Sequence, residues 1–292
     1  MTDTDRRPCA SYDRSACEFV SLGSFDDKSG LVGHVSVAQC KHCGLGISLP
    51  PLRDVSFLYA NRESQDFQPQ TTGLSHRIKD WFFRRQAAVL IRQLGGPPGS
   101  ILDFGCGSGQ FTRCLGDLVG ADRVTASDFH DEPPVELRGR NYLPAAMRKH
   151  YRGMFAAVIA MHVLEHDDDS ESLLEQIVSM THRGGMVVIE VPNVRCVWAR
   201  ILGRHWDAWY MPYHRTHFSR VALRAMMVRA GLTIIADRGA CVPTMGRSLA
   251  NIFRAKNNLF FLLVGAALQP IQWFGEKLTG EASAIRIIAR RD

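Results

Sequence analysis

The sequence has few of the residues that mark a disulfide scaffold, a proline-rich linker or a glycine repeat. Its 292 residues include 8 cysteines, 13 prolines and 25 glycines, which excludes those three classes. Residues 1–8 have no positively charged start that leads into an apolar core, so we expect no secretory signal and a cytoplasmic location. In a reducing compartment, closely spaced cysteines indicate metal binding or catalysis rather than disulfides.

Charge and apolar runs are also limited. The chain has 35 Lys and Arg against 29 Asp and Glu, and the basic residues are scattered. A net charge of +6 is modest for a dedicated nucleic-acid-binding protein, so we expect no nucleic-acid partner. The longest apolar stretch, residues 257–275, contains Gln269, Pro270 and Gln272, so we expect no transmembrane span. Hydrophobic residues, at 46%, are sufficient for a large buried core.

Apolar patterning predicts strands that alternate with helices. A helical pattern covers residues 74–94 and stops at two glycines and two prolines. Further helices are predicted after residue 109, from Ser170 to a glycine cap near 182–185, and from Ser219 to 231. The predicted strands are 100–104, 123–127, 155–161, 186–191, 232–236 and 284–289. This alternation predicts a mostly parallel sheet with helices on both faces and ligands at the carboxyl ends of its strands.

A glycine-rich turn follows the strand that ends at Phe104. Gly105, Gly107 and Gly109 are spaced G-x-G-x-G, which lets the backbone approach a ligand closely while the next helix presents free N–H groups. Asp128 ends the following strand, where a carboxylate can accept hydrogen bonds from both hydroxyls of a ribose. We therefore predict a ligand that contains a nucleoside. The spacing does not fit the G-x-G-x-x-G pattern of dinucleotide sites.

Five motifs in order resemble those of the class I S-adenosylmethionine-dependent methyltransferases. They are ILDFGCGSG at 101–109, SDF at 127–129, MHVLEH at 161–166, GGMVVIEVPN at 184–193 and PYHRTHFS at 212–219. The resemblance implies a Rossmann-like α/β fold with a seven-stranded, mostly parallel sheet. It also implies an enzyme that uses S-adenosylmethionine as its cofactor.

The resemblance also assigns the cofactor-binding residues. It places Gly105, Gly107 and Gly109 beneath the methionine portion, Asp128 on the ribose and Asp103 at the amino-acid end of the cofactor. Other positions of the same motifs complete the expected cofactor site, namely Phe104, Cys106, Phe129 and His162.

Two of the motifs supply candidates for a catalytic base. Methyl transfer from a sulfonium is an in-line displacement, so the protein must align the acceptor and remove a proton from a neutral hydroxyl or activated carbon. The candidates at the predicted ligand edge are His162, Glu165, His166, Tyr213, His214 and His217. A histidine titrates near neutrality, which suits a base, but each could instead be a capping or buried structural histidine. The acidic residues 167–169 indicate a helix start rather than a divalent-metal site.

A C-x-x-C motif lies near the N-terminus. Cys40 and Cys43 have the spacing with which two thiolates bind one zinc ion from a tight turn. Cys9 and Cys17 could complete the site, with His34 and His42 as substitutes. Methyltransferases of sugar and natural-product pathways carry a similar segment with C-x-x-C in both halves, whereas seven residues separate Cys9 from Cys17 here. A structural zinc ion and a set of reduced thiols therefore remain alternatives.

These features divide the chain into a cysteine-bearing segment, residues 1–72, and a methyltransferase domain, residues 73–292. An apolar insertion at about 247–280 precedes the last strand. We expect it to form a helix on the body or a dimer contact. A lid over an apolar acceptor or a peripheral membrane contact is the alternative, favoured by nearby cations at Arg247, Arg254 and Lys256.

The sequence therefore predicts a methyltransferase that acts on an oxygen or carbon of a small-molecule acceptor. Sugars, polyketides, quinone-like compounds and other secondary metabolites are the expected classes. One alternative is an RNA methyltransferase that uses the cysteine segment to bind its substrate. It lacks support, because no Asn/Asp-Pro-Pro-aromatic motif follows the strand at 155–161. Another alternative is a non-catalytic cofactor-binding scaffold, although a scaffold needs neither the glycine turn nor Asp128.

Overall fold

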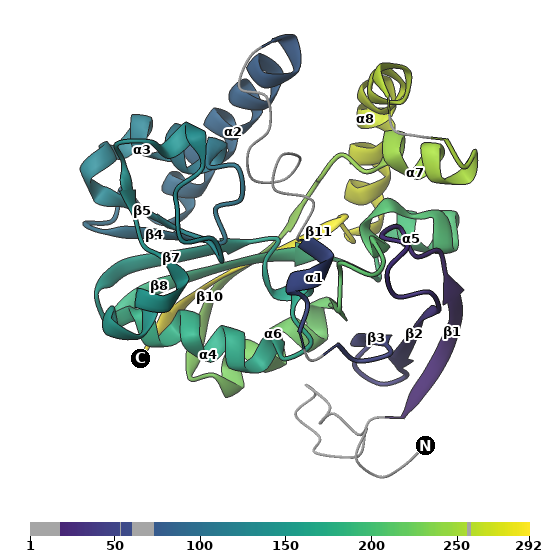
Figure 1. Ribbon diagram of the computed structural model, residues 1–292, viewed down its shortest axis with the longest axis horizontal. Helices are drawn as coiled ribbons and strands as arrows, with labels where there is room; N and C mark the ends of the chain where they lie inside the picture. The colour runs from purple at the N-terminus through teal and green to yellow at the C-terminus, as the bar shows by residue number, and fades with distance from the viewer. Residues whose placement is uncertain (1–17, 53, 60–72, 256–257) are drawn as a thin grey trace.

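Two sheets organise the chain in the computed structural model, which describes residues 18–52, 54–59, 73–255 and 258–292 (Figure 1). The larger sheet has seven strands in the order β10-β11-β8-β7-β4-β5-β6. These strands are β4 (Ile101–Phe104), β5 (Val124–Ser127), β6 (Asn141–Tyr142), β7 (Phe155–Met161), β8 (Thr181–Pro192), β10 (Leu232–Ala240) and β11 (Ala284–Arg291). β11 runs antiparallel to both its neighbours and the other strands are mutually parallel, which confirms the predicted fold class.

Helices cover both faces of this sheet. α2 (Leu74–Gln93) and α3 (Gln110–Val119) lie on one face, and α4 (Ser170–Met180) and α6 (Arg220–Arg229) lie on the other (Figure 1). Neighbouring residues of a strand point to opposite faces, so Ile101 packs in the cluster with α2 and α3 while Leu102 packs with α4 and α6. A parallel sheet buried on both faces explains the nearly continuous apolar runs of β4, β7 and β8.

Capping residues fix where α4 and α6 begin. The Asp169 carboxylate accepts from the Ser172 N–H at 3.1 Å, and the Ser219 hydroxyl accepts from the Ala222 N–H at 3.1 Å. Both helix starts agree with the sequence prediction. The end of α4 differs from it, because β8 already begins at Thr181 and the glycines expected to cap the helix lie in an irregular stretch of β8.

The smaller sheet joins the N-terminal segment to the body. Its order is β1-β2-β3-β9, from β1 (Phe19–Phe25), β2 (Val35–Cys40), β3 (Gly46–Leu49) and β9 (Thr216–His217). β9 belongs to the 212–219 motif of the body, and Cys40 and Cys43 pack in the same hydrophobic cluster as Phe104. The division at residue 72 therefore follows chain order but does not separate two hydrophobic cores.

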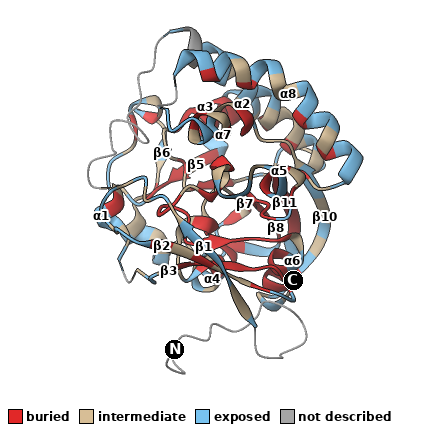
Figure 2. Cartoon of the chain, turned by 90° about the vertical axis from the view of Figure 1, so that its right-hand side faces the viewer, coloured by how far each residue is buried: buried red, intermediate tan, exposed pale blue. Residues whose placement is uncertain are grey.

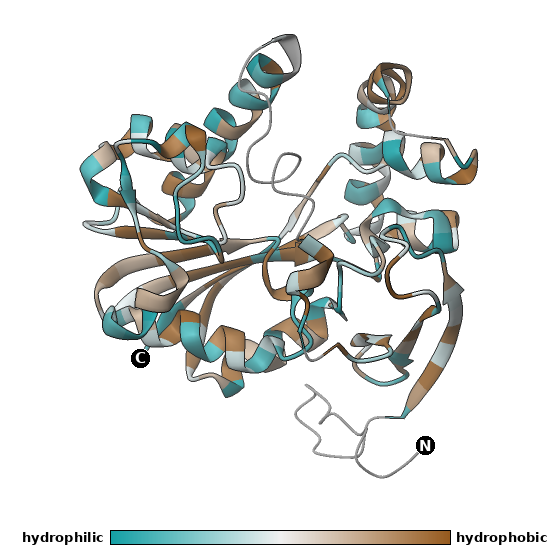
Figure 3. Ribbon diagram, in the orientation of Figure 1, coloured by the Kyte–Doolittle hydropathy of each residue, from teal (hydrophilic) through white to brown (hydrophobic). Residues whose placement is uncertain are grey.

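The apolar insertion forms two helices, α7 (Met245–Ile252) and α8 (Leu259–Thr279), near the short helix α5 (Val197–Leu202). α7 and α8 cross closely at two glycines, since a Cβ on Gly246 would lie 2.2 Å from the carbonyl oxygen of Phe261. By length and composition α8 could cross a membrane, with a mean hydropathy of 1.2, whereas the sequence predicted no such span. Figure 2 colours most of α8 as exposed or partly buried, and Figure 3 shows hydrophobic residues along it.

Candidate cofactor and active site

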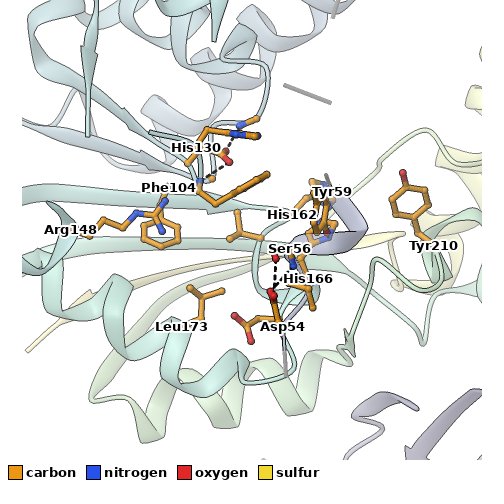
Figure 4. Close-up of a pocket in the computed structure, with 17 residues that line it drawn as sticks. Asp54, Ser56, Tyr59, Phe104, His130, Arg148, His162, His166, Leu173 and Tyr210 are labelled. Atoms are coloured by element: carbon orange, nitrogen blue, oxygen red, sulfur yellow. Dashed lines mark hydrogen bonds between the residues drawn. The ribbon is translucent and has the colours of Figure 1, made fainter. Parts of the chain in front are cut away.

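A pocket of about 530 Å³ lies at the carboxyl ends of β4, β5 and β7 (Figure 4). Seven of the residues predicted for the site line it, namely Phe104, Gly105, Gly107, Asp128, Phe129, His162 and His166. The other predicted residues of the described chain are not part of this lining. The pocket has the size of ordinary small-molecule sites and lies at the sheet edge that the sequence predicted.

The glycine turn can be built only from glycine at two of its positions. The φ angles of Gly105 and Gly109 are 79° and 77°, in the left-handed region. A Cβ on Gly105 would lie 2.4 Å from Val163 Cγ2, and one on Gly109 would lie 2.5 Å from Leu137 Cγ. The turn therefore packs tightly against its own supports and leaves the bare backbone of Gly105 facing the pocket.

Asp128 ties the end of β5 to the glycine turn. Its Oδ2 accepts from the Gly107 N–H at 2.7 Å, and its Oδ1 accepts from the Phe129 N–H at 2.8 Å. Each carboxylate oxygen keeps a second lone pair, so the group can still accept from two ribose hydroxyls. The residues present therefore fit the nucleoside part of S-adenosylmethionine.

Asp103, Cys106 and Gly109 support the turn from behind. Asp103 is buried and accepts a hydrogen bond from the Thr112 hydroxyl, and burial raises the pKa of Asp103 to about 7. Burial also raises the pKa of the Cys106 thiol. None of the three lines the pocket, and their predicted contact with the cofactor stays a prediction.

His162 follows β7 and is held by two carboxylates. Its Nδ1 lies 3.1 Å from Glu165 Oε1, its Nε2 lies 3.3 Å from Glu190 Oε1, and its φ of 57° is rare for a residue with a side chain. Burial opposes the charged ring, but the two carboxylates raise the pKa of His162 to about 10. The ring is therefore an imidazolium at neutral pH. A ring that carries both protons has no lone pair to accept another, which argues against His162 as the base, while its predicted contact with the cofactor stays a prediction.

His166 follows on the same segment and lines the pocket. Its Nδ1 lies 2.8 Å from the Tyr59 hydroxyl and 3.2 Å from the Tyr213 carbonyl oxygen. The carbonyl can only accept from Nδ1, whereas the nearer Tyr59 hydroxyl can either accept from it or donate to it. In the first arrangement Nδ1 carries the proton of the neutral ring and Nε2 keeps its lone pair. Of the histidines predicted as candidate bases, His162 and His166 line the pocket.

His214 and Glu165 lie beside His166. The His214 Nδ1–H donates to the Ala208 carbonyl at 2.8 Å, and burial together with neighbouring His166 lowers the pKa of His214 well below its usual value. One ligand atom from each of Glu165, His166 and His214 lies within 4.8 Å of the others. Two histidine nitrogens and a carboxylate can hold a divalent cation, whereas the sequence pointed to cysteines as the metal ligands.

His217 belongs to the small sheet. It is buried in β9, with its Nε2 3.0 Å from the Ser48 hydroxyl and its ring 5.1 Å from that of Trp209. Burial and the nearby Arg215 cation lower the pKa of His217 to about 3. His217 is not part of the pocket lining, and its buried position in the small sheet favours a structural role over the predicted role of a base.

Several pocket residues lie outside the five motifs and were not predicted from the sequence. Tyr59 in α1 (Ser56–Tyr59) comes from the N-terminal segment, and its ring lies 5.6 Å from Phe129 and 5.7 Å from Tyr213. Arg148 lies on the far side, with its guanidinium 4.2 Å from the centre of the Phe104 ring. The aromatic residues at 206–213 were the one available signal, and they supply Tyr210 to the pocket.

A family model described as "Methyltransferase domain" matches residues 75–237, more than half of the chain. The chain belongs to this methyltransferase family. The match includes the glycine turn, Asp128 and the MHVLEH motif, and it ends within β10. The recognition of the chain as a class I S-adenosylmethionine-dependent methyltransferase is thereby confirmed.

Curated relatives match part of this domain. Two ubiquinone biosynthesis O-methyltransferases, from Shewanella pealeana and Shewanella halifaxensis, are 30% and 31% identical to it over 116 residues. The match covers 35% of this chain and 48% of each relative, so the chain spans about half the length of the curated relatives it matches.

Solved structures similar to the chain include two methyltransferases. A 1,6-didemethyltoxoflavin-N1-methyltransferase from Burkholderia thailandensis is 17% identical, covers 89% of this chain and 97% of its own, and has a TM-score of 0.49. A SAM-dependent methyltransferase from Archaeoglobus fulgidus is also 17% identical, covers 75% of this chain and 100% of its own, and has a TM-score of 0.47.

Proposed function

We propose that this enzyme transfers the methyl group of S-adenosylmethionine to an oxygen or carbon of a small aromatic or quinone-like acceptor. The observation that carries the proposal is one pocket that joins the glycine turn and Asp128 to His166 and an aromatic wall. The names of the curated relatives, which are O-methyltransferases, support oxygen as the accepting atom.

The cofactor would lie between β4 and β5. Asp128 would hold the ribose through its remaining lone pairs, and the backbone of Gly105 would face the methionine portion. The bound cofactor supplies an electrophilic methyl group on a positively charged sulfur. His162, Glu165, Glu190 and Arg286 form a connected cluster of two cations and two anions with no net charge, so this wall of the pocket does not repel the sulfonium.

His166 would accept the proton from the acceptor. With Nδ1 donating to the Tyr213 carbonyl, Nε2 would take a proton from a hydroxyl or activated carbon. The nearby Glu165 carboxylate would stabilise the imidazolium that forms, since their ligand atoms lie within 4.8 Å. A positioned base contributes roughly 10² to 10⁴ in rate.

Aromatic side chains favour a flat acceptor. The rings of Tyr59 and Phe129 stand 5.6 Å apart in a tilted arrangement, and Tyr210 lies further along the pocket (Figure 4). Such rings offer apolar faces together with the hydroxyl groups of tyrosine, which suits a phenol or quinol better than a charged or highly hydroxylated ligand.

The test is a transfer assay with methyl-labelled S-adenosylmethionine and separate panels of phenols, quinols and sugars. We expect labelled phenol or quinol products, and His166→Gln should lower kcat by roughly 10² or more with cofactor affinity nearly unchanged. His182→Gln is the matched control, because His182 is an exposed histidine on β8. Labelling confined to sugars would contradict the acceptor class, and full activity of His166→Gln would contradict the base.

A structural zinc ion is a second proposal, for the N-terminal segment. Cys40 and Cys43 are both 1% exposed and flank a tight turn in which the Gly44 N–H donates to the Cys40 carbonyl at 3.0 Å. The φ of Gly44 is 74°, which the turn requires. This geometry supports two thiolates on one ion. The other two predicted ligands, Cys9 and Cys17, lie outside the described residues.

A further inference from the structure

Helix α8 buries two polar side chains, Gln272 and Glu276, and exposes a stripe of large apolar side chains. The buried positions along it are Phe261, Gly265, Gln272 and Glu276. Phe260, Leu263, Ile271, Phe274 and Leu278 form a single stripe at helical spacing on the opposite side, and they are 58 to 77% exposed. A helix on the surface of a water-soluble protein has the reverse arrangement, so the outer stripe is suited to an apolar surrounding.

The inward polar groups anchor α8 to the body. The Gln272 amide donates to the Val242 carbonyl at 2.7 Å and to Glu276 Oε1 at 2.8 Å, and its Oε1 accepts from the Thr244 N–H at 3.3 Å. Crossing a bilayer would break these bonds and leave the groups in hydrocarbon. α8 is long enough to cross a bilayer. Its bonds to the body instead suit a helix that stays packed on the protein with one face in a lipid surface.

A second exposed apolar patch lies on α2. Ile78, Trp81 and Phe82 are exposed on this helix, and α2 and α8 lie at the same end of the molecule in both views (Figures 1 and 2). Each helix pairs an exposed tryptophan with a cation, Arg85 over Trp81 at 5.7 Å and Lys277 over Trp273 at 5.8 Å. Tryptophans beside Lys or Arg are typical of the interface between water and lipid.

The charge of these helices favours an anionic surface. Every exposed charged side chain that the structure describes on α2, α7 and α8 is a cation: Arg77, Lys79, Arg84, Arg85, Arg92, Arg247 and Lys277. Arg84 and Arg247 are paired with Asp117 and Asp207. The other cations would repel a second copy of this face and attract anionic headgroups.

We propose that the outer stripe of α8, together with the exposed face of α2, binds the surface of an anionic lipid bilayer. The apolar side chains would enter the boundary between headgroups and acyl chains, and the cations would contact the headgroup phosphates. This inference stands apart from the proposed chemistry, because it rests on residues outside the pocket.

The test is co-sedimentation of the full chain with vesicles of phosphatidylcholine, with and without phosphatidylglycerol, at low and high salt. We expect binding to the anionic vesicles that weakens as salt rises. Phe260→Gln/Phe274→Gln should weaken this binding by about tenfold or more, because two buried aromatic side chains are removed from lipid. Arg85→Gln/Lys277→Gln should reduce the preference for phosphatidylglycerol and leave the thermal unfolding midpoint unchanged.

The matched control is Val221→Gln/Met154→Gln, which replaces two residues that are 58% and 59% exposed outside α2 and α8. It should bind vesicles as the unaltered chain does. The proposal is overturned if the chain stays in the supernatant with all vesicles, or if both aromatic substitutions leave binding unchanged. A dimer in light scattering that Phe260→Gln/Phe274→Gln dissociates, without any vesicle binding, would assign the stripe to a second copy of the chain instead.

Discussion

Replacement of Asp128 by alanine should weaken cofactor binding in a protein that still folds. In Asp128→Ala the ribose hydroxyls lose an ionised acceptor, and hydrogen bonds to charged groups contribute about 1.5 to 3 kcal/mol. At about 1.4 kcal/mol per factor of ten, the dissociation constant for S-adenosylmethionine should rise by roughly 10- to 100-fold. The Gly107 and Phe129 N–H groups also lose their partner, so part of this loss comes from a less ordered turn.

Asp128→Asn distinguishes the two contributions. The amide keeps one oxygen acceptor but turns a donor toward one of the two backbone N–H groups, and it has no charge. We expect a smaller loss of affinity than in Asp128→Ala, measured by isothermal titration with S-adenosylmethionine and S-adenosylhomocysteine. Asp131→Ala, an exposed aspartate three residues away, should bind as the unaltered chain does. Unchanged affinity in a folded Asp128→Ala protein would refute the assignment of the ribose site.

Two further predictions concern stability and metal content. His217 has a pKa lowered to about 3, so the stability that its neutral form contributes is present above the unfolded pKa near 6.5 and is lost as pH falls from there toward 3. Thermal melts should show a shallower acid loss in His217→Gln, and an identical slope would contradict the buried neutral ring. Metal analysis should find about one zinc per chain and much less in Cys40→Ser/Cys43→Ser, and a zinc-free purified protein would contradict the proposed site.

The sequence predicted the sheet and its ligand edge because those depend on local patterns. The strand at 100–104, the turn at Gly105 and the carboxylate at Asp128 lie within one short stretch, and their apolar runs and spacing determine where they meet. The caps at Asp169 and Ser219 are equally local. Each of these features is determined by a few residues that are neighbours in the sequence.

The roles of the histidines depended on residues far away in the chain. The pKa of His162 is raised by Glu165, three residues along the chain, and also by Glu190, which comes from the neighbouring strand β8. His217 becomes structural because β9 pairs with β3 of the N-terminal segment, a contact that no short motif encodes. Tyr59 enters the pocket for the same reason, since its helix comes from that segment. Side-chain chemistry at this site is therefore set by tertiary contacts that a single sequence does not display.

Titration of the unaltered chain with S-adenosylmethionine, S-adenosylhomocysteine and NAD tests the central claim most directly. We expect the first two to bind with micromolar dissociation constants and NAD not to bind, because the glycine turn and Asp128 form a site for a nucleoside without a pyrophosphate. The assignment of the cofactor site would be contradicted if NAD alone bound, or if neither S-adenosylmethionine nor S-adenosylhomocysteine bound.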